Sequence, residues 1–127
     1  MQKILDTVNA YAAAINTMNA IAYVACFAPD SELYDPADGA AFYGHDGALA
    51  FFSQFEPLLE SIRFTPGQVH LSGNHAAFPW RIEANGKNGR TASAEGIDAA
   101  VFNDDGHIVT LRGYWNAGPF VAALTAV

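Results

Sequence analysis

The sequence predicts an α+β fold, with helices in its first half and a mainly antiparallel sheet in its second half. Apolar residues recur at helical spacing near the N-terminus, whereas extended segments dominate from Glu60 onward. Two connections, residues 85–89 and 103–106, have the Asn, Asp and Gly content of hairpin turns. Helices that precede the strands, rather than alternate with them, are typical of α+β folds.

The first half of the chain predicts three helices. The first has an apolar face made by Ile4, Val8, Tyr11, Ala12 and Ile15. Asn19 can cap a second helix, which we expect to run to about residue 27 and to close at residues 28–30. A third helix is expected at residues 46–55, with Leu49, Phe52 and either Ala50 or Phe51 on its buried side.

A short strand at residues 31–34 precedes a turn cluster at residues 35–39. Asp35 therefore lies at a strand end, where the following Pro36 keeps it out of helical geometry. Later strands are expected at residues 61–65, 68–72, 75–84, 90–103 and 107–116. Their hairpin connections predict an antiparallel meander.

The long strand at residues 90–103 alternates between two different faces. Ala92, Ala94, Gly96, Asp98, Ala100 and Phe102 share one of them. Small side chains on the concave side of a bent sheet leave space for a pocket, into which Asp98 would project. Desolvation would then raise the pKa of Asp98, and a neutral carboxylic acid can donate a hydrogen bond. The alternative is a partnered or edge-facing Asp98, with Glu95 merely exposed.

Composition limits the possible functions. The 127 residues are expected to form one domain, residues 1–127, and the net charge of -7 argues against nucleic acid and anionic membrane partners. No stretch approaches the roughly 20 apolar residues of a membrane span. The lone Cys26 is interpreted as a buried apolar residue, and nothing calls for an oxidising compartment. We therefore expect a cytoplasmic protein.

Several motifs, taken together in order, resemble the bacterial Δ5-3-ketosteroid isomerases. The similarity covers about residues 5–116 and is carried by Tyr11, Leu33-Tyr34-Asp35-Pro36, Tyr43-Gly44-His45, Ala50-Phe51-Phe52, Ile97-Asp98, residues 102–108 and Gly113-Tyr114-Trp115. The resemblance implies the cone-shaped fold shared with nuclear transport factor 2, in which three helices and a curved sheet enclose a deep apolar pocket. It also implies a homodimer formed through the outer face of the sheet.

By this resemblance, Asp35 matches the general base, and Tyr11 and Asp98 match the two donors of the oxyanion hole. Trp115 matches an aromatic residue that binds the base in one branch of the family. The implied reaction moves a C=C bond of a 3-ketosteroid through a dienolate, and one carboxylate can shuttle the proton without a cofactor. A neutral acid that donates a hydrogen bond is a known feature of this family.

The sequence departs from the family at two positions. Phe27 and Phe52 stand where some members have tyrosines that support the oxyanion-hole tyrosine, so Tyr11 would lack that network. The aromatic and small residues expected to contact a steroid-like ligand are Phe27, Phe51, Phe52, Trp80, Ala100 and Trp115. His45, His70, His75 and His107 do not show metal-ligand spacing, so no metal is expected.

Two alternatives to the isomerase remain. One is a polyketide cyclase-like enzyme of the same fold, and the other is a non-catalytic binder of hydrophobic ligands, since one fold serves many functions. The apolar segment at residues 118–127 either covers the mouth of the pocket or contributes to a dimer surface.

Overall fold

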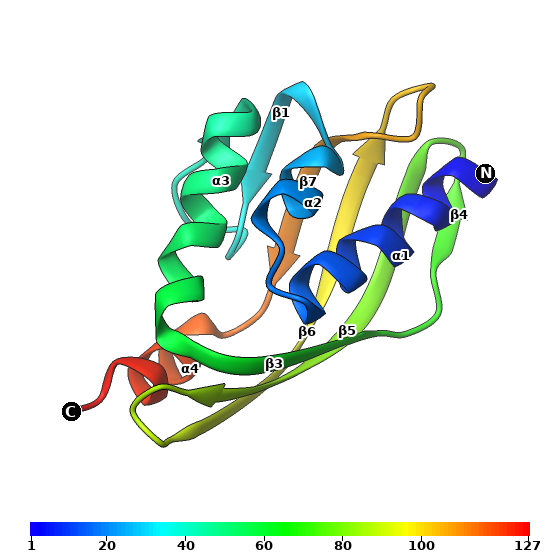
Figure 1. Ribbon diagram of the computed structural model, residues 1–127. Helices are drawn as coiled ribbons and strands as arrows, with labels where there is room; N and C mark the ends of the chain where they lie inside the picture. The colour runs from blue at the N-terminus through cyan, green and yellow to red at the C-terminus, as the bar shows by residue number, and fades with distance from the viewer.

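The computed structural model describes residues 1–127 as an α+β fold. A curved seven-stranded sheet is covered on one face by α1 (Gln2–Asn16), α2 (Ala20–Ala25) and α3 (Gly44–Phe55), while α4 (Ala117–Thr125) lies at one end of the sheet (Figure 1). A short 3-10 helix, Glu56–Leu58, follows α3. None of the four α-helices combines the length and apolar composition that crossing a bilayer requires.

The sheet is mixed rather than purely antiparallel. Its strand order is β2-β1-β7-β6-β5-β3, with β4 paired to β5, and only β1 and β7 run parallel. The strands are β1 (Phe27–Tyr34), β2 (Phe42–Tyr43), β3 (Leu59–Pro66), β4 (His70–Ser72), β5 (His75–Gly86), β6 (Thr91–Phe102) and β7 (Ile108–Tyr114). The antiparallel meander expected for the late strands is confirmed.

Local sequence explains how the first two helices are fixed. The Asn19 side chain caps α2 by accepting a hydrogen bond from Ala22 N at 3.0 Å, as the sequence predicts. At the end of α1, Asn16 donates to the Phe64 carbonyl and accepts from the Phe64 amide, at 3.1 and 2.6 Å. These two bonds hold the end of α1 against β3 and place Tyr11 over the sheet.

Some predicted boundaries and faces are wrong. The second helix ends at Ala25, and β1 begins at Phe27 because this segment pairs with β7. Pro29 fits within β1 because the ladder is irregular between Phe27 and Glu32. Leu49 is exposed, and Ala48 occupies the buried position on α3 instead.

The C-terminal segment forms a helix that the sequence reading did not predict, so the fold has four helices instead of three. Phe120 and Leu124 of α4 are buried and pack in a small cluster with Leu59 and Ala84. Asn88, in the turn after β5, donates to the carbonyls of Ala123 and Ala126, which ties the end of α4 to the sheet.

The face of the sheet away from the helices carries charged and apolar side chains together. Arg81 pairs with Glu83 and Glu95 on this face, and all three side chains are exposed. Ile97 and Tyr114 are about half exposed beside them, at 50% and 51%. The homodimer implied by the family resemblance stays a prediction.

Candidate active site

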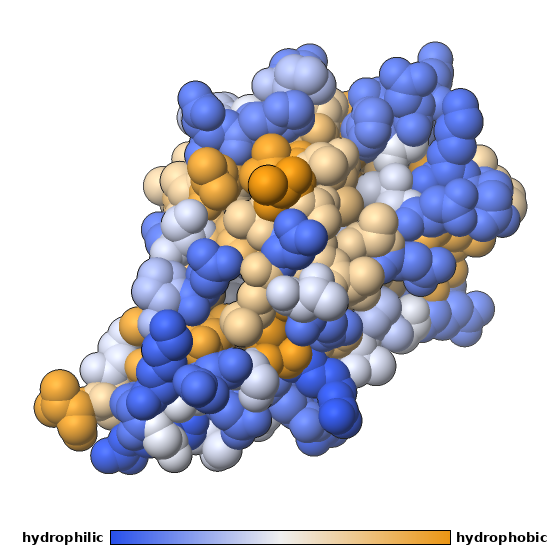
Figure 2. All heavy atoms as spheres, in the orientation of Figure 1, coloured by the Kyte–Doolittle hydropathy of each residue, from blue (hydrophilic) through white to orange (hydrophobic).

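An apolar pocket lies between the helices and the concave face of the sheet. The space between its atoms, open mouth included, is about 670 Å³, and 14 of its 17 lining residues are hydrophobic. In the space-filling view, apolar side chains reach the surface around a hollow on this face (Figure 2). The lining residues are Tyr11, Ile15, Met18, Tyr23, Asp35, Phe51, Phe52, Phe55, Glu56, Leu59, Ile62, Phe64, Trp80, Ile82, Asp98, Trp115 and Phe120.

Three neighbouring strands bring Asp35 and Asp98 to the same pocket. Asp98 on β6 pairs with Gly113 on β7, and Asp35 directly follows β1, the next strand. A Cβ atom on Gly113 would collide with the Asp35 carboxylate, so glycine leaves the room that Asp35 occupies. The turn after Asp35 is fixed to the same glycine, because Ala37 N donates to the Gly113 carbonyl at 2.7 Å.

The pKa of the Asp35 carboxyl group lies close to neutral pH. Its Oδ1 accepts a hydrogen bond from Trp115 Nε1 at 2.6 Å. Burial raises the pKa of Asp35 to about 6, and the Trp115 bond opposes this rise because it favours the charged form. At neutral pH the group is therefore ionised and can accept a proton.

Asp98 is more deeply buried, with 2% of its surface exposed. Its Oδ1 accepts a hydrogen bond from Trp80 Nε1 at 2.9 Å, while Oδ2 has no partner in the protein. Burial raises the pKa of Asp98 well above its usual value, the charge of Asp35 raises it further, and the Trp80 bond acts in the opposite direction. The protonated form is thus favoured, and it can donate a hydrogen bond.

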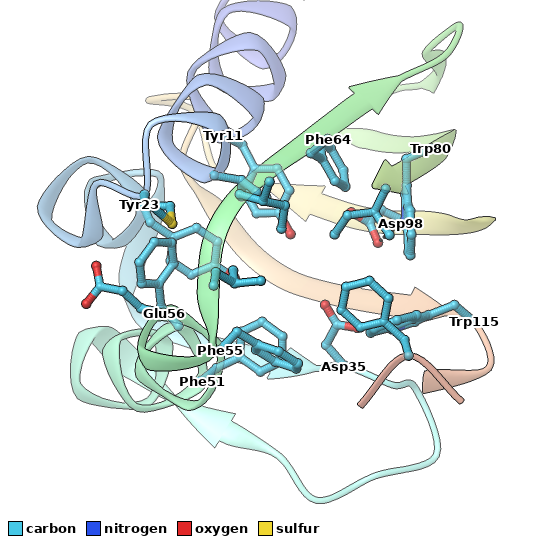
Figure 3. A pocket seen from close by; sticks show the side chains of 17 residues that line it. Tyr11, Tyr23, Asp35, Phe51, Phe55, Glu56, Phe64, Trp80, Asp98 and Trp115 are labelled. Carbon is cyan, nitrogen blue, oxygen red and sulfur yellow. Dashed lines mark hydrogen bonds between the residues drawn. The ribbon is translucent and has the colours of Figure 1, made fainter. Parts of the chain in front are cut away.

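Tyr11 completes the polar part of the pocket. Burial raises the pKa of its hydroxyl well above 10, with further contributions from Tyr23, Asp98 and Asp35, so the hydroxyl keeps its proton. Figure 3 shows Tyr11, Asp98 and Asp35 around the same cavity, with Trp80 and Trp115 on the sheet side. The close-up also shows the Glu56 carboxylate turned away from these groups.

The structure places the other expected contact residues in two groups. Phe51, Phe52, Trp80 and Trp115 line the pocket. Phe27 and Ala100 do not line it. Phe27 packs against the rings of Tyr11 and Tyr23 in the core. Ala100 lies on the predicted face of β6, but it is two residues beyond Asp98 and is buried in the core.

Tyr23 is a lining residue that the sequence reading missed. It is 1% exposed, and its hydroxyl has no hydrogen-bond partner in the protein. Its ring lies 5.3 Å from that of Tyr11 and 4.9 Å from that of Phe52, between centroids. A second hydroxyl therefore lies close to Tyr11 although Phe27 and Phe52 carry none. The only sequence signal was an aromatic residue within a short apolar helix.

Comparison with known proteins assigns the family. Residues 8–111 match the family model described as the SnoaL-like domain. The chain belongs to the SnoaL-like family. This SnoaL-like protein is 28% identical over 100 residues to a steroid Δ-isomerase of Nocardioides simplex, and the match covers 79% of each chain.

Solved structures share the fold of this SnoaL-like protein. The Δ5-3-ketosteroid isomerase from Mycobacterium sp. superposes with a TM-score of 0.79 at 23% identity, covering 92% of this chain and 95% of the other. RV0760c from Mycobacterium tuberculosis, in complex with estradiol-17beta-hemisuccinate, gives a TM-score of 0.80 at 21% identity, covering 92% and 96%. These likenesses support the NTF2-like cone predicted from the sequence.

Proposed function

We propose that this protein is a steroid Δ-isomerase, which moves a C=C bond of a 3-ketosteroid from the β,γ to the α,β position. The observation that carries the proposal is the different state of two nearby carboxyl groups in one apolar pocket. Asp35, with a pKa of about 6, can accept a proton at neutral pH, whereas Asp98 favours the neutral form. Such a pair can supply a base and a hydrogen-bond donor to one substrate.

The proposed reaction uses one proton and no cofactor. Asp35 removes a proton from C4 of the substrate, and the electron pair shifts to give a dienolate whose charge lies on the C3 oxygen. Protonated Asp35 then returns the proton to C6, which completes the conjugated enone. Tyr11 and neutral Asp98 donate hydrogen bonds to the C3 oxygen as its charge grows. The apolar walls exclude water, which strengthens these bonds.

The shape of the pocket supports a flat, apolar substrate. Aromatic rings of Phe51, Phe52, Trp80 and Trp115 form much of its wall, and the polar groups named above lie together. The steroid Δ-isomerase relative and the estradiol derivative bound to RV0760c are consistent with a steroid-like ligand.

The test is an absorbance assay with 5-androstene-3,17-dione and the purified protein. We expect conversion to the conjugated enone, and we expect Asp35→Ala to remove nearly all turnover. Asp38→Ala is the matched control, because Asp38 is an exposed acid three residues later in the same turn. Equal activity in both variants would contradict the assignment of Asp35 as the base.

Binding measurements separate the enzyme from a non-catalytic binder. Equilenin, a phenolic steroid, resembles the dienolate and should bind more tightly than a saturated ketone of equal size. Tyr11→Phe and Asp98→Ala should each slow turnover by about 10²- to 10³-fold. Tight steroid binding without any turnover in the unmodified protein would instead support the binder.

A further inference from the structure

Trp80 is held in contact with Asp98 by the register of two strands. It lies on β5 opposite Gly96 of β6, and Asp98 is two residues further along β6 on the same face. The indole is 6% exposed and packs against the rings of Phe64 and Trp115, with centroids at 5.5 and 5.4 Å. Its Nε1 lies 2.9 Å from Asp98 Oδ1.

The absence of a side chain at Gly96 leaves the space in which the Trp80 indole lies. A Cβ atom at this position would stand 2.6 Å from Trp80 Cζ2 and 2.8 Å from Trp115 Cβ. Any larger residue would therefore displace the Trp80 indole, the Trp115 side chain or the backbone at Tyr114. β6 thus leaves space for the Trp80 indole at Gly96, two residues before Asp98, whose carboxyl group accepts the hydrogen bond from Trp80.

The hydrogen bond from the indole N–H favours one position for the proton of a neutral Asp98. An indole N–H is a donor only, so the oxygen that it binds must act as an acceptor. A neutral carboxylic acid has one carbonyl oxygen and one hydroxyl oxygen. The carbonyl oxygen is the stronger acceptor of the two, so the bond from Trp80 favours Oδ1 as the carbonyl oxygen and Oδ2, which has no partner in the protein, as the hydroxyl.

We propose that Trp80 is a positioning residue that orients Asp98 so that Oδ2–H is presented to the ligand's carbonyl oxygen. This inference rests on the proposed function, because it assigns a role to Trp80 through the oxyanion-hole donor. It also differs from the role expected from the sequence, in which Trp80 is only an apolar contact. Asp35 from the end of β1, Tyr11 from α1 and Tyr23 from α2 are the other titratable groups around this acid.

The first test compares Asp98→Asn with Asp98→Ala in two backgrounds. With Trp80 present, the amide oxygen of asparagine should accept from the indole, which leaves the NH₂ group as a donor to the ligand. Asp98→Asn should then keep at least tenfold more turnover and equilenin affinity than Asp98→Ala. In the Trp80→Phe background no indole holds the amide oxygen, so the amide group introduced by Asp98→Asn can rotate by 180°. The ratio of turnover, and of equilenin affinity, between Asp98→Asn and Asp98→Ala should then fall toward one.

Trp80→Phe alone should lower kcat about tenfold, the effect of one lost hydrogen bond of about 1.4 kcal/mol, and change KM much less. The same Asn-to-Ala ratio in both backgrounds would overturn the proposal. Equilenin affinity keeps the test independent of turnover. If the unmodified protein does not isomerise the substrate, the proposed function fails, while the affinity ratio still decides the role of Trp80.

A second measurement needs no Trp80 variant and so does not depend on whether that variant folds. The chain has two tryptophans, which give two indole N–H resonances in an NMR spectrum. The resonance of Trp80 should stay nearly unchanged in Asp98→Asn and shift upfield in Asp98→Ala, while that of Trp115 moves little in either. Equal shifts of the Trp80 resonance in both variants would show that Oδ1 is not held as an acceptor.

Discussion

Replacing Asp35 by asparagine should make the folded protein more stable above pH 6 while it removes the proposed base. In the folded protein the pKa of Asp35 is about 6, against 3.8 for the free group, because burial disfavours the carboxylate. Asparagine is neutral at every pH and can still accept the hydrogen bond from Trp115 through its amide oxygen. The variant therefore keeps the contact and loses the buried charge.

The sign of the effect follows from proton linkage. Between pH 3.8 and about 6, the folded chain holds a proton on Asp35 that the unfolded chain has released. The free energy of unfolding of the unmodified protein therefore falls as pH rises through this window. The shift corresponds to about 3 kcal/mol, and we expect about 2 to 3 kcal/mol because Asp35 is partly open to the cavity. Below this window the two proteins should be equally stable.

Urea unfolding followed by tryptophan fluorescence, at several values between about pH 4 and 8, would measure this difference. Asp38→Asn is the control, since Asp38 is exposed in the same turn and its replacement should change little at any pH. A difference between Asp35→Asn and the unmodified protein that does not grow with pH would refute the reasoning. A lower stability of Asp35→Asn than of the unmodified protein at pH 8 would also refute it.

Three further outcomes are expected. Turnover should rise with pH through about 6 as Asp35 ionises, and Trp115→Phe should move this rise to higher pH because it removes the bond that lowers the pKa of Asp35. Tyr23→Phe should change the unfolding free energy of the ligand-free protein by no more than about 1 kcal/mol, measured by urea unfolding, because the buried hydroxyl that it removes has only the Tyr11 hydroxyl as a polar neighbour. Phe120→Ala should lower that free energy by about 3 kcal/mol and weaken equilenin binding, measured by titration, because Phe120 is buried and lines the pocket.

The positions of Asp35 and Asp98 were accessible from the sequence because each depends on local pattern. A strand end followed by proline located Asp35, and the two-residue period of β6 placed Asp98 on the inner face. The same period also put Ala100 on the correct face. It could not give the depth of the pocket along the strand, which depends on where the helices cross the sheet.

Contacts between elements were not accessible in the same way. The bond from Trp80 to Asp98 depends on the register of β5 against β6, and the composition of the hairpin at residues 85–89 predicts that these strands pair without giving the turn type that sets their register. Tyr23 reaches the pocket because α2 is short and turns directly into β1 at Phe27. The sequence predicts a longer helix, to about residue 27, and carries no signal that Tyr23 lies beside Tyr11.

The two carboxyl groups have similar hydrogen-bond partners, yet burial raises the pKa of Asp98 more than that of Asp35. Each accepts one indole N–H, at 2.6 Å for Asp35 and 2.9 Å for Asp98, and each bond favours the charged form. Asp98 lies within a central strand and is almost fully buried, whereas Asp35 lies at a strand end and is partly open to the cavity. Once Asp35 ionises, its charge raises the pKa of Asp98 further. Burial therefore favours the neutral form of Asp98 more strongly than that of Asp35, and this difference follows from where each carboxyl group lies in its strand.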